Sequence, residues 1–81
     1  MQTYTLHTDP GHGWLQVPIT EVQRLGLKIS SYSYRTPEFA YLEEDCDYSA
    51  WANAKRAAGE GFDVTVMHLD FDHFIREFER F

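Results

Sequence analysis

The chain has little cysteine, few basic side chains and no long apolar run. Its single cysteine excludes an internal disulfide and fits a reducing compartment. Seven Lys and Arg against thirteen Asp and Glu give a net charge of −6, which argues against direct binding to nucleic acid or to an anionic membrane. No segment has the length of a transmembrane helix, and the first residues lack the pattern of a signal peptide. We therefore expect a soluble, cytoplasmic protein.

The acidic side chains are concentrated in the second half of the chain. Residues 1–37 carry three basic and two acidic side chains, so their net charge is +1. Residues 38–81 carry four basic and eleven acidic side chains, so theirs is −7. A basic partner is the natural complement of such a surface.

The composition is that of a folded chain. Hydrophobic residues make up 43% and aromatic residues 16%, which is too rich for disorder. A chain of this length buries only about 60–65% of the surface that it exposes when unfolded, and large rings compensate for the short length. We expect one domain over residues 1–81.

The segment YTLHTDPGHGWLQV predicts a β-hairpin. Apolar and polar side chains alternate before and after TDPGHG, and Asp-Pro-Gly is typical of a turn. The alternation places Leu6 opposite Leu15 on one face and His7 opposite Trp14 on the other.

The segment SSYSYRTPEFAYLEE predicts a second hairpin. A two-residue turn at 36–37 would pair Tyr34 with Phe39 and Tyr32 with Tyr41. One face would then be aromatic, and it could be either core or a half-exposed contact surface.

Helical patterns follow each hairpin. A short helix is expected after Pro18 with a stop at Gly26, and EEDCDYSAWANAKRAAG predicts a longer one, capped by Asp45 or Asp47 and ended by Gly59 or Gly61. FDVTVMHL alternates as a strand does, and the last residues fit either a short helix or an irregular tail that docks its rings. Short connections favour antiparallel pairing, so the order ββαββαβ predicts an α+β domain with helices on one side of an antiparallel sheet.

Catalytic and metal sites find little support in these patterns. His7, His12, Asp70 and His73 could bind a metal only if the fold gathered them, because their spacing matches no ligand motif. DPGHG is followed by a strand rather than by a helix, which argues against a phosphate loop. Cys46 lies near a helix N-terminus but among acids that disfavour its thiolate. We expect neither an enzyme nor a cofactor.

The surplus of acids in EEDCD predicts a surface for a partner, because a helix N-terminus needs only one or two of them. Tyrosines nearby would add contact area with a polar tip. The predicted partner-binding residues are Tyr32, Tyr34, Glu38, Tyr41, Glu43, Glu44, Asp45 and Asp47.

Four stretches of the chain, YTLHTDPGHGWLQVP, LGLKISSYSY, AYLEEDCD and a terminal R-x-F, resemble a group of small proteins encoded by phages, prophages and plasmids of Proteobacteria. The likeness runs nearly end to end. It implies a mobile-element context and assigns a role to no residue. Small accessory proteins of such elements often inhibit host defence, and anti-CRISPR proteins are examples.

Three functional hypotheses follow. The first is a non-enzymatic inhibitor, monomeric or dimeric, whose acidic aromatic surface occupies a basic, nucleic-acid-handling site on a host protein. The second is a small metal-binding module or metal-dependent enzyme that uses His7, His12, Asp70 and His73. The third is a homodimeric structural accessory protein with the tail phenylalanines in its interface.

Overall fold

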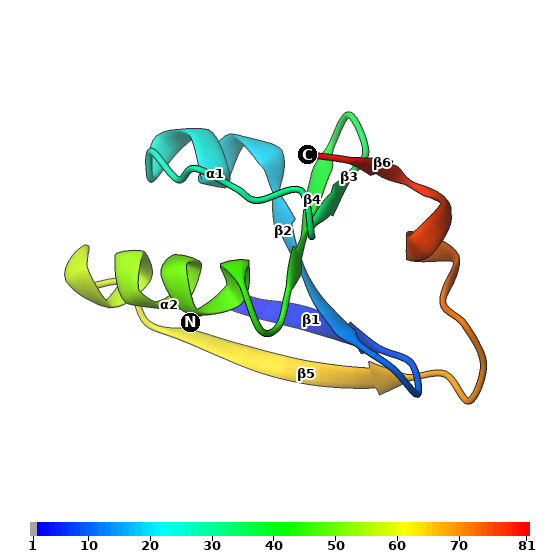
Figure 1. The fold of residues 1–81 in the computed structure, drawn as a ribbon. Helices are drawn as coiled ribbons and strands as arrows, with labels where there is room; N and C mark the ends of the chain where they lie inside the picture. The colour runs from blue at the N-terminus through cyan, green and yellow to red at the C-terminus, as the bar shows by residue number, and fades with distance from the viewer. Residues whose placement is uncertain (1) are drawn as a thin grey trace.

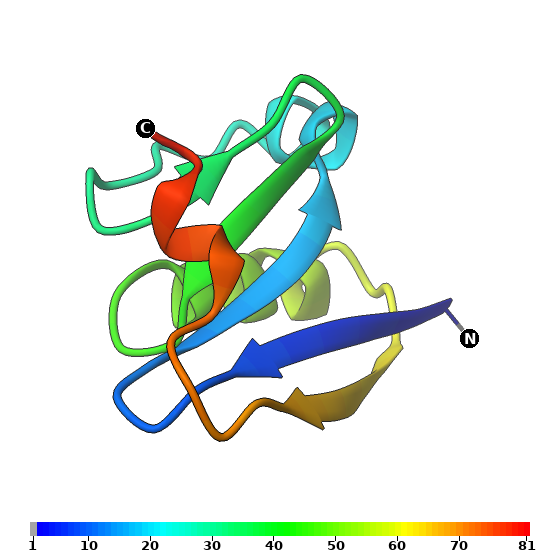
Figure 2. The ribbon, with the colours of Figure 1, turned by 90° about the vertical axis from the view of Figure 1, so that its right-hand side faces the viewer.

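A six-stranded mixed sheet, with two α-helices on one face and the C-terminal segment on the other, forms the domain (Figures 1 and 2). The computed structural model describes residues 2–81. The elements are β1 (Gln2–Thr8), β2 (Gly13–Pro18), α1 (Ile19–Arg24), β3 (Tyr34–Arg35), β4 (Phe39–Glu43), α2 (Asp47–Ala57), β5 (Phe62–His68), the 3₁₀ turn η1 (Phe74–Glu77) and β6 (Glu79–Arg80). The sheet order is β5-β1-β2-β4-β3-β6. The α+β class and the order ββαββαβ are confirmed.

The first hairpin has the predicted register. Leu6 pairs with Leu15 and His7 with Trp14. The turn closes where the Asp9 N–H donates to the carbonyl of His12 at 2.9 Å.

The predicted register of the second hairpin is wrong by two residues. Tyr34 pairs with Tyr41 rather than with Phe39. The turn is longer than predicted: the N–H of Thr36 donates to the carbonyl of Phe39 at 2.9 Å, and the N–H of Phe39 donates to the Thr36 hydroxyl at 3.1 Å. A shift of two residues leaves each side chain on its face, because side chains alternate with a period of two. Tyr34 and Tyr41 therefore still share a face, while Tyr32 lies outside the strand.

The sheet is mixed rather than wholly antiparallel. β1 and β4 are both antiparallel to β2, so they run in the same direction. α2 carries the chain back, and β5 then pairs in parallel with β1 along its whole length, from Gln2 opposite Phe62 to Thr8 opposite His68. A helical crossover of this kind is what a parallel pair requires.

Each face of the sheet has its own core. The helix side buries Tyr4, Leu15, Val17, Val22, Ala40, Leu42, Trp51 and Ala52. The opposite side buries Trp14, Tyr34, Tyr41 and Ile75, with Phe39 and Phe78 packed against them. The aromatic face is therefore core, covered by η1 and the ring of Phe78, while β6 extends the sheet by pairing with β3 (Figure 2). Both expected forms of the tail are present, since it contains a short helical turn and docks its rings.

The helix ends follow the predicted stops but not the predicted caps. Gly26 and Gly59 have φ of +66° and +70° and follow α1 and α2, which is the conformation that favours glycine. At the start of α2, however, the capping residue is Cys46, without a side-chain hydrogen bond, and neither Asp45 nor Asp47 caps. None of the helices within residues 2–81 has the length and apolar character needed to cross a membrane.

Candidate functional site

Asp9, in the first turn, anchors the C-terminal segment. One carboxylate oxygen accepts from the Arg76 Nη2 at 2.9 Å, and the other accepts from the Arg76 Nε at 2.8 Å and from the His73 N–H at 3.0 Å. The N–H groups of Gly11 and His12 donate to the same side chain at 3.0 and 2.9 Å. The segment that carries two histidines and two glycines is thus a turn that ties residues 73–76 to the sheet.

This cluster shifts the acidity of Asp9 strongly. The Arg76 guanidinium and the three backbone N–H groups outweigh burial and hold the pKa of the Asp9 carboxyl well below its ordinary value of 3.8. The side chain of Asp9 is fully buried, whereas that of Arg76 is 31% exposed. A charged carboxylate is therefore built into the structure at neutral pH.

Two of the predicted surface acids are buried. Asp47 accepts from the N–H and hydroxyl of Ser30 and from the hydroxyl of Ser33. Glu43 accepts from the Asp45 N–H at 2.8 Å and lies 3.5 Å from the His12 Nδ1. These acids organise the loops around β4, so the expectation that they face outward is wrong.

Of the other six predicted partner-binding residues, two are buried and four are exposed. Tyr34 and Tyr41 are each 7% exposed and belong to the core. Tyr32, Glu38, Glu44 and Asp45 are exposed. Glu38 precedes β4 and Glu44 follows it, so they lie at opposite ends of a five-residue strand, about 20 Å apart at 3.3 Å per residue. The structure does not bring the eight residues into one patch.

An exposed apolar area lies at the tail, where the third hypothesis places an interface; sequence reasoning did not identify which of its side chains are exposed. Met67, Phe71 and Phe74 are 58%, 68% and 56% exposed. Phe71 and Phe74 line a shallow hollow together with Asp72, His73, Arg76 and Glu77. We call the group Met67, Asp70, Phe71, Asp72, Phe74 and Glu77 the tail surface. The density of phenylalanine after position 70 was the available signal, but it does not tell Phe78, which packs on Tyr41 with ring centroids 5.1 Å apart, from the outward rings.

The predicted metal-binding residues are only partly brought together. The rings of His7 and His73 lie 5.1 Å apart between centroids, but His7 Nε2 is 2.8 Å from the Gln16 side-chain oxygen and the ring of His73 accepts from the Ile75 N–H. Burial lowers the pKa of His73, and nearby His7 adds to the effect. Asp70 lies 3.3 Å from His68 instead. In the part of the chain that the structure describes, no three His, Cys, Asp or Glu side chains are grouped to hold an ion.

A buried polar network links the helices to the sheet. Glu21 on α1 accepts from the hydroxyl of Tyr4 at 2.7 Å and from the indole of Trp51 at 2.8 Å. Lys55 donates to Tyr4, Glu21 and Glu60 at 3.0–3.1 Å. Burial opposes the charge of Lys55, but these three partners outweigh it and raise its pKa. The network pairs its buried charges and stabilises the fold; no sequence motif marks it.

Cys46 is exposed and lies in acidic surroundings. Partial desolvation and the carboxylates of Glu43, Asp47 and Asp45 raise the pKa of its thiol. Less thiolate is present at neutral pH than for a free cysteine. The site lacks the features of a cysteine nucleophile.

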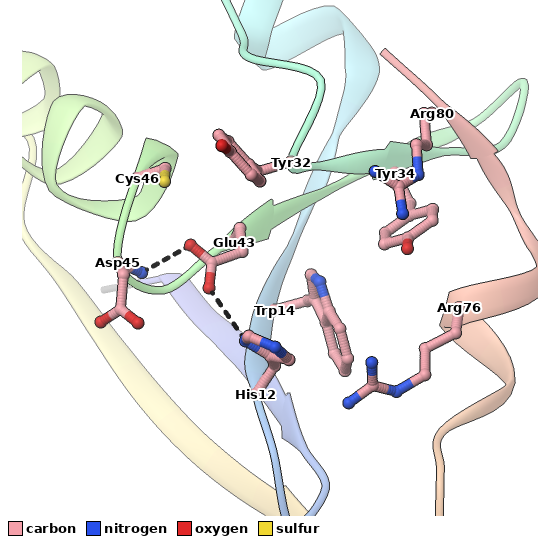
Figure 3. Close-up of a pocket in the computed structure, with 9 residues that line it drawn as sticks. All are labelled: His12, Trp14, Tyr32, Tyr34, Glu43, Asp45, Cys46, Arg76 and Arg80. Atoms are coloured by element: carbon pink, nitrogen blue, oxygen red, sulfur yellow. Dashed lines mark hydrogen bonds and ion pairs between the residues drawn. The ribbon is translucent and has the colours of Figure 1, made fainter.

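A pocket of about 280 Å³ lies between the loops beside β4 and the tail (Figure 3). It is lined by His12, Trp14, Tyr32, Tyr34, Glu43, Asp45, Cys46, Arg76 and Arg80. The indole nitrogen of Trp14 is the one buried side-chain nitrogen or oxygen within residues 2–81 that lacks a hydrogen-bond partner. A buried N–H without an acceptor costs about 1–3 kcal/mol, so an unpaired donor of this kind calls for an explanation.

Comparison with known proteins gives no relative from which to transfer a function: no family model, no curated protein and no solved structure matches the chain.

Proposed function

We propose that the protein is a non-enzymatic binding protein that docks on a basic, nucleic-acid-handling surface of another protein through its tail surface. The observation that carries the proposal is the exposure of Phe71 and Phe74 in a hollow that is also lined by the acids Asp72 and Glu77. Within the described residues, neither Asp72 nor Glu77 forms an ion pair, and Asp70 pairs only with His68. Large rings exposed together mark interaction sites on small soluble domains.

The charges around the rings favour a basic partner over a second copy of the chain. A two-fold dimer would bring the same surface against itself, so the acids of one copy would face those of the other. A basic surface would instead complement them, speed association and make binding sensitive to salt. Basic surfaces on proteins commonly serve to hold nucleic-acid phosphates.

The fold supports this use of the tail. Arg76 lies in the same hollow, but Asp9 engages it and cancels its charge locally. η1 is held by Ile75, which is fully buried, and by the anchor at Asp9. The ring of Phe74 is therefore presented from an anchored turn, which lowers the entropy lost on binding.

The likeness to phage, prophage and plasmid proteins adds the biological part of the proposal. In that context the partner is a host protein, and occupation of its nucleic-acid site inhibits it, as an anti-CRISPR protein does. The protein would then act in the cytoplasm of a bacterial host.

Two variants with equal changes of net charge test the proposal. The tail variant carries Asp70→Lys, Asp72→Lys and Glu77→Lys, and its matched control carries Glu38→Lys, Glu44→Lys and Asp45→Lys. Each is immobilised as the full chain, exposed to bacterial lysate, and its bound proteins are identified by mass spectrometry. We expect the wild type and the control to retain the same nucleic-acid-binding protein, and a short DNA duplex to displace it.

Binding of each variant to the purified partner is then measured to give the change in affinity. The tail variant is expected to bind it at least about ten-fold more weakly, with a smaller dependence on salt. Equal loss in both variants, or a partner that DNA does not displace, would contradict the proposal. So would a wild-type dimer, seen by analytical ultracentrifugation, that Phe71→Ser abolishes, because the tail surface would then belong to a second copy.

A further inference from the structure

The pocket of Figure 3 has polar groups of opposite kinds on its two sides. Trp14 from β2, Tyr34 from β3 and Arg80 from β6 lie on one side, and Glu43 and Asp45 from the end of β4 lie on the other. The exposed ring of Tyr32 lies above them. A pocket of about 280 Å³ is near the lower limit for small-molecule sites.

The donor side lacks an acceptor. Trp14 is 2% exposed, and its Nε1 has no hydrogen-bond partner in the described part of the chain, while the Nε1 of Trp51 donates to Glu21 at 2.8 Å. Figure 3 shows Tyr34 and Arg80 on the same side of the indole, with the Tyr34 ring nearer to it than the Arg80 guanidinium. Arg80 lies over the Tyr34 ring, 5.2 Å from its centroid, and forms no ion pair with residues 2–81. A neutral donor and a cationic donor that line one pocket suit a carboxylate.

The acceptor side is anionic. Glu43 is held by the Asp45 N–H and by His12, and the Asp45 side chain is exposed and forms no ion pair in the described residues. The second guanidinium of the pocket, that of Arg76, lies 5.1 Å from the Trp14 ring centroid and is paired with Asp9. The charges that no Lys or Arg pairs with, or that no carboxylate pairs with, are therefore Arg80 on one side and the carboxylates of Glu43 and Asp45 on the other.

We propose that this pocket binds a small zwitterion of the size of a free amino acid. Its carboxylate accepts from Trp14 Nε1 and from Arg80, and its ammonium group lies against the carboxylates of Glu43 and Asp45. A simple anion satisfies the donors but meets the carboxylates, and a simple amine does the reverse. The site is separate from the tail surface, since Asp70, Asp72 and Glu77 do not line it.

The two indole N–H signals in a ¹H–¹⁵N NMR spectrum provide a direct test. The Trp14 indole signal is expected to change when a ligand enters the pocket. The Trp51 indole, which donates to Glu21, is the control in the same molecule. Trp14→Phe assigns the signals. The common L-amino acids are added singly at about 10 mM, a concentration that detects millimolar dissociation constants. At least one is expected to move the Trp14 indole signal downfield and leave that of Trp51 in place.

Two pairs of variants test the roles of the charges. Arg80→Gln and Asp45→Asn are each expected to weaken the binding of that amino acid about ten-fold. Arg56→Gln and Glu44→Gln remove the same charges outside the pocket and are expected to leave the affinity unchanged. Movement of the Trp14 signal by no amino acid overturns the proposal. Acetate or ethylamine that binds as tightly as the amino acid overturns it as well, because a single charge would then suffice.

Discussion

The attachment of the tail to Asp9 gives the sharpest prediction about stability. In Asp9→Asn, one oxygen remains to accept from Gly11 and His12, but an NH₂ group replaces the oxygen that accepts from the His73 N–H and the Arg76 Nε. The new NH₂ group would then face the His73 N–H and the Arg76 Nε, and none of these three donors has an acceptor. The negative charge that pairs with the Arg76 guanidinium is also lost. Removal of one partner of a buried ion pair costs about 3–5 kcal/mol. For a domain of this size, a loss of 3 kcal/mol corresponds to a fall in Tm of roughly 12 °C or more.

Calorimetry and hydrogen exchange measure the effect. We expect Asp9→Asn to lower Tm by this amount and to release the amide protons of Ile75 and Arg76, which lie in the segment that Asp9 holds. Asp70→Asn is the matched control, because the Asp70 side chain is 98% exposed. It is expected to change the free energy of unfolding by less than about 0.5 kcal/mol. If Asp9→Asn and Asp70→Asn have the same Tm and the same hydrogen-exchange protection of Ile75 and Arg76, Asp9 does not anchor the tail.

The pH dependence of stability follows from the lowered pKa of Asp9. The unfolded chain binds this proton near the ordinary value of 3.8, and the folded chain binds it only at lower pH. The contribution of Asp9 is therefore complete above that value and is lost as the pH falls through the folded pKa. The Tm difference between the wild type and Asp9→Asn is expected to shrink between about pH 4 and pH 2. A constant difference would contradict the assigned cause.

Three further substitutions or reactions test other parts of the structure. Lys55→Met removes the buried cation of Glu21 and leaves only the half-exposed Arg24, 3.7 Å away, as its ion-pair partner. Urea denaturation is therefore expected to show a loss of about 3 kcal/mol, against less than about 0.5 kcal/mol for Arg56→Met on the exposed side of α2; equal losses would refute the network. Gly59→Ala places a side chain at φ +70° and is expected to destabilise the fold by about 1 kcal/mol in the same assay; no loss would mean that the backbone there can change. Because the pKa of the Cys46 thiol is raised, an aromatic disulfide reagent at neutral pH is expected to modify it more slowly in the folded chain than in urea, and faster reaction in the folded chain would contradict the acidic environment.

Local patterns were sufficient where neighbours in the sequence decide the structure. The register of the first hairpin follows from alternation around Asp-Pro-Gly, and the helix stops follow from glycines that can adopt positive φ. The second hairpin was harder, because residues 36–39 form a longer turn closed by the Thr36 hydroxyl. The period of two kept its aromatic face correct even though the pairing was wrong.

The predicted partner surface shows what local patterns leave open. Glu43, Glu44, Asp45 and Asp47 look alike in the sequence, but only Glu44 and Asp45 are exposed. The difference depends on Ser30, whose N–H and hydroxyl donate to Asp47, and on other groups distant in the chain. A run of acids therefore predicts a charged region but not which carboxylates are available to a partner.

By itself the sequence determined the class of fold, the order of its elements, the first hairpin and the acidic character of the second half, because each depends on composition or on contacts within about a dozen residues. Only the tertiary structure decided that β5 pairs in parallel with β1, that Asp9 holds the tail, that Trp14 Nε1 is left without an acceptor beside Arg80, and that Phe71 and Phe74 face outward. The first three features join segments more than fifty residues apart, and all four depend on how the whole chain packs, which no short pattern contains.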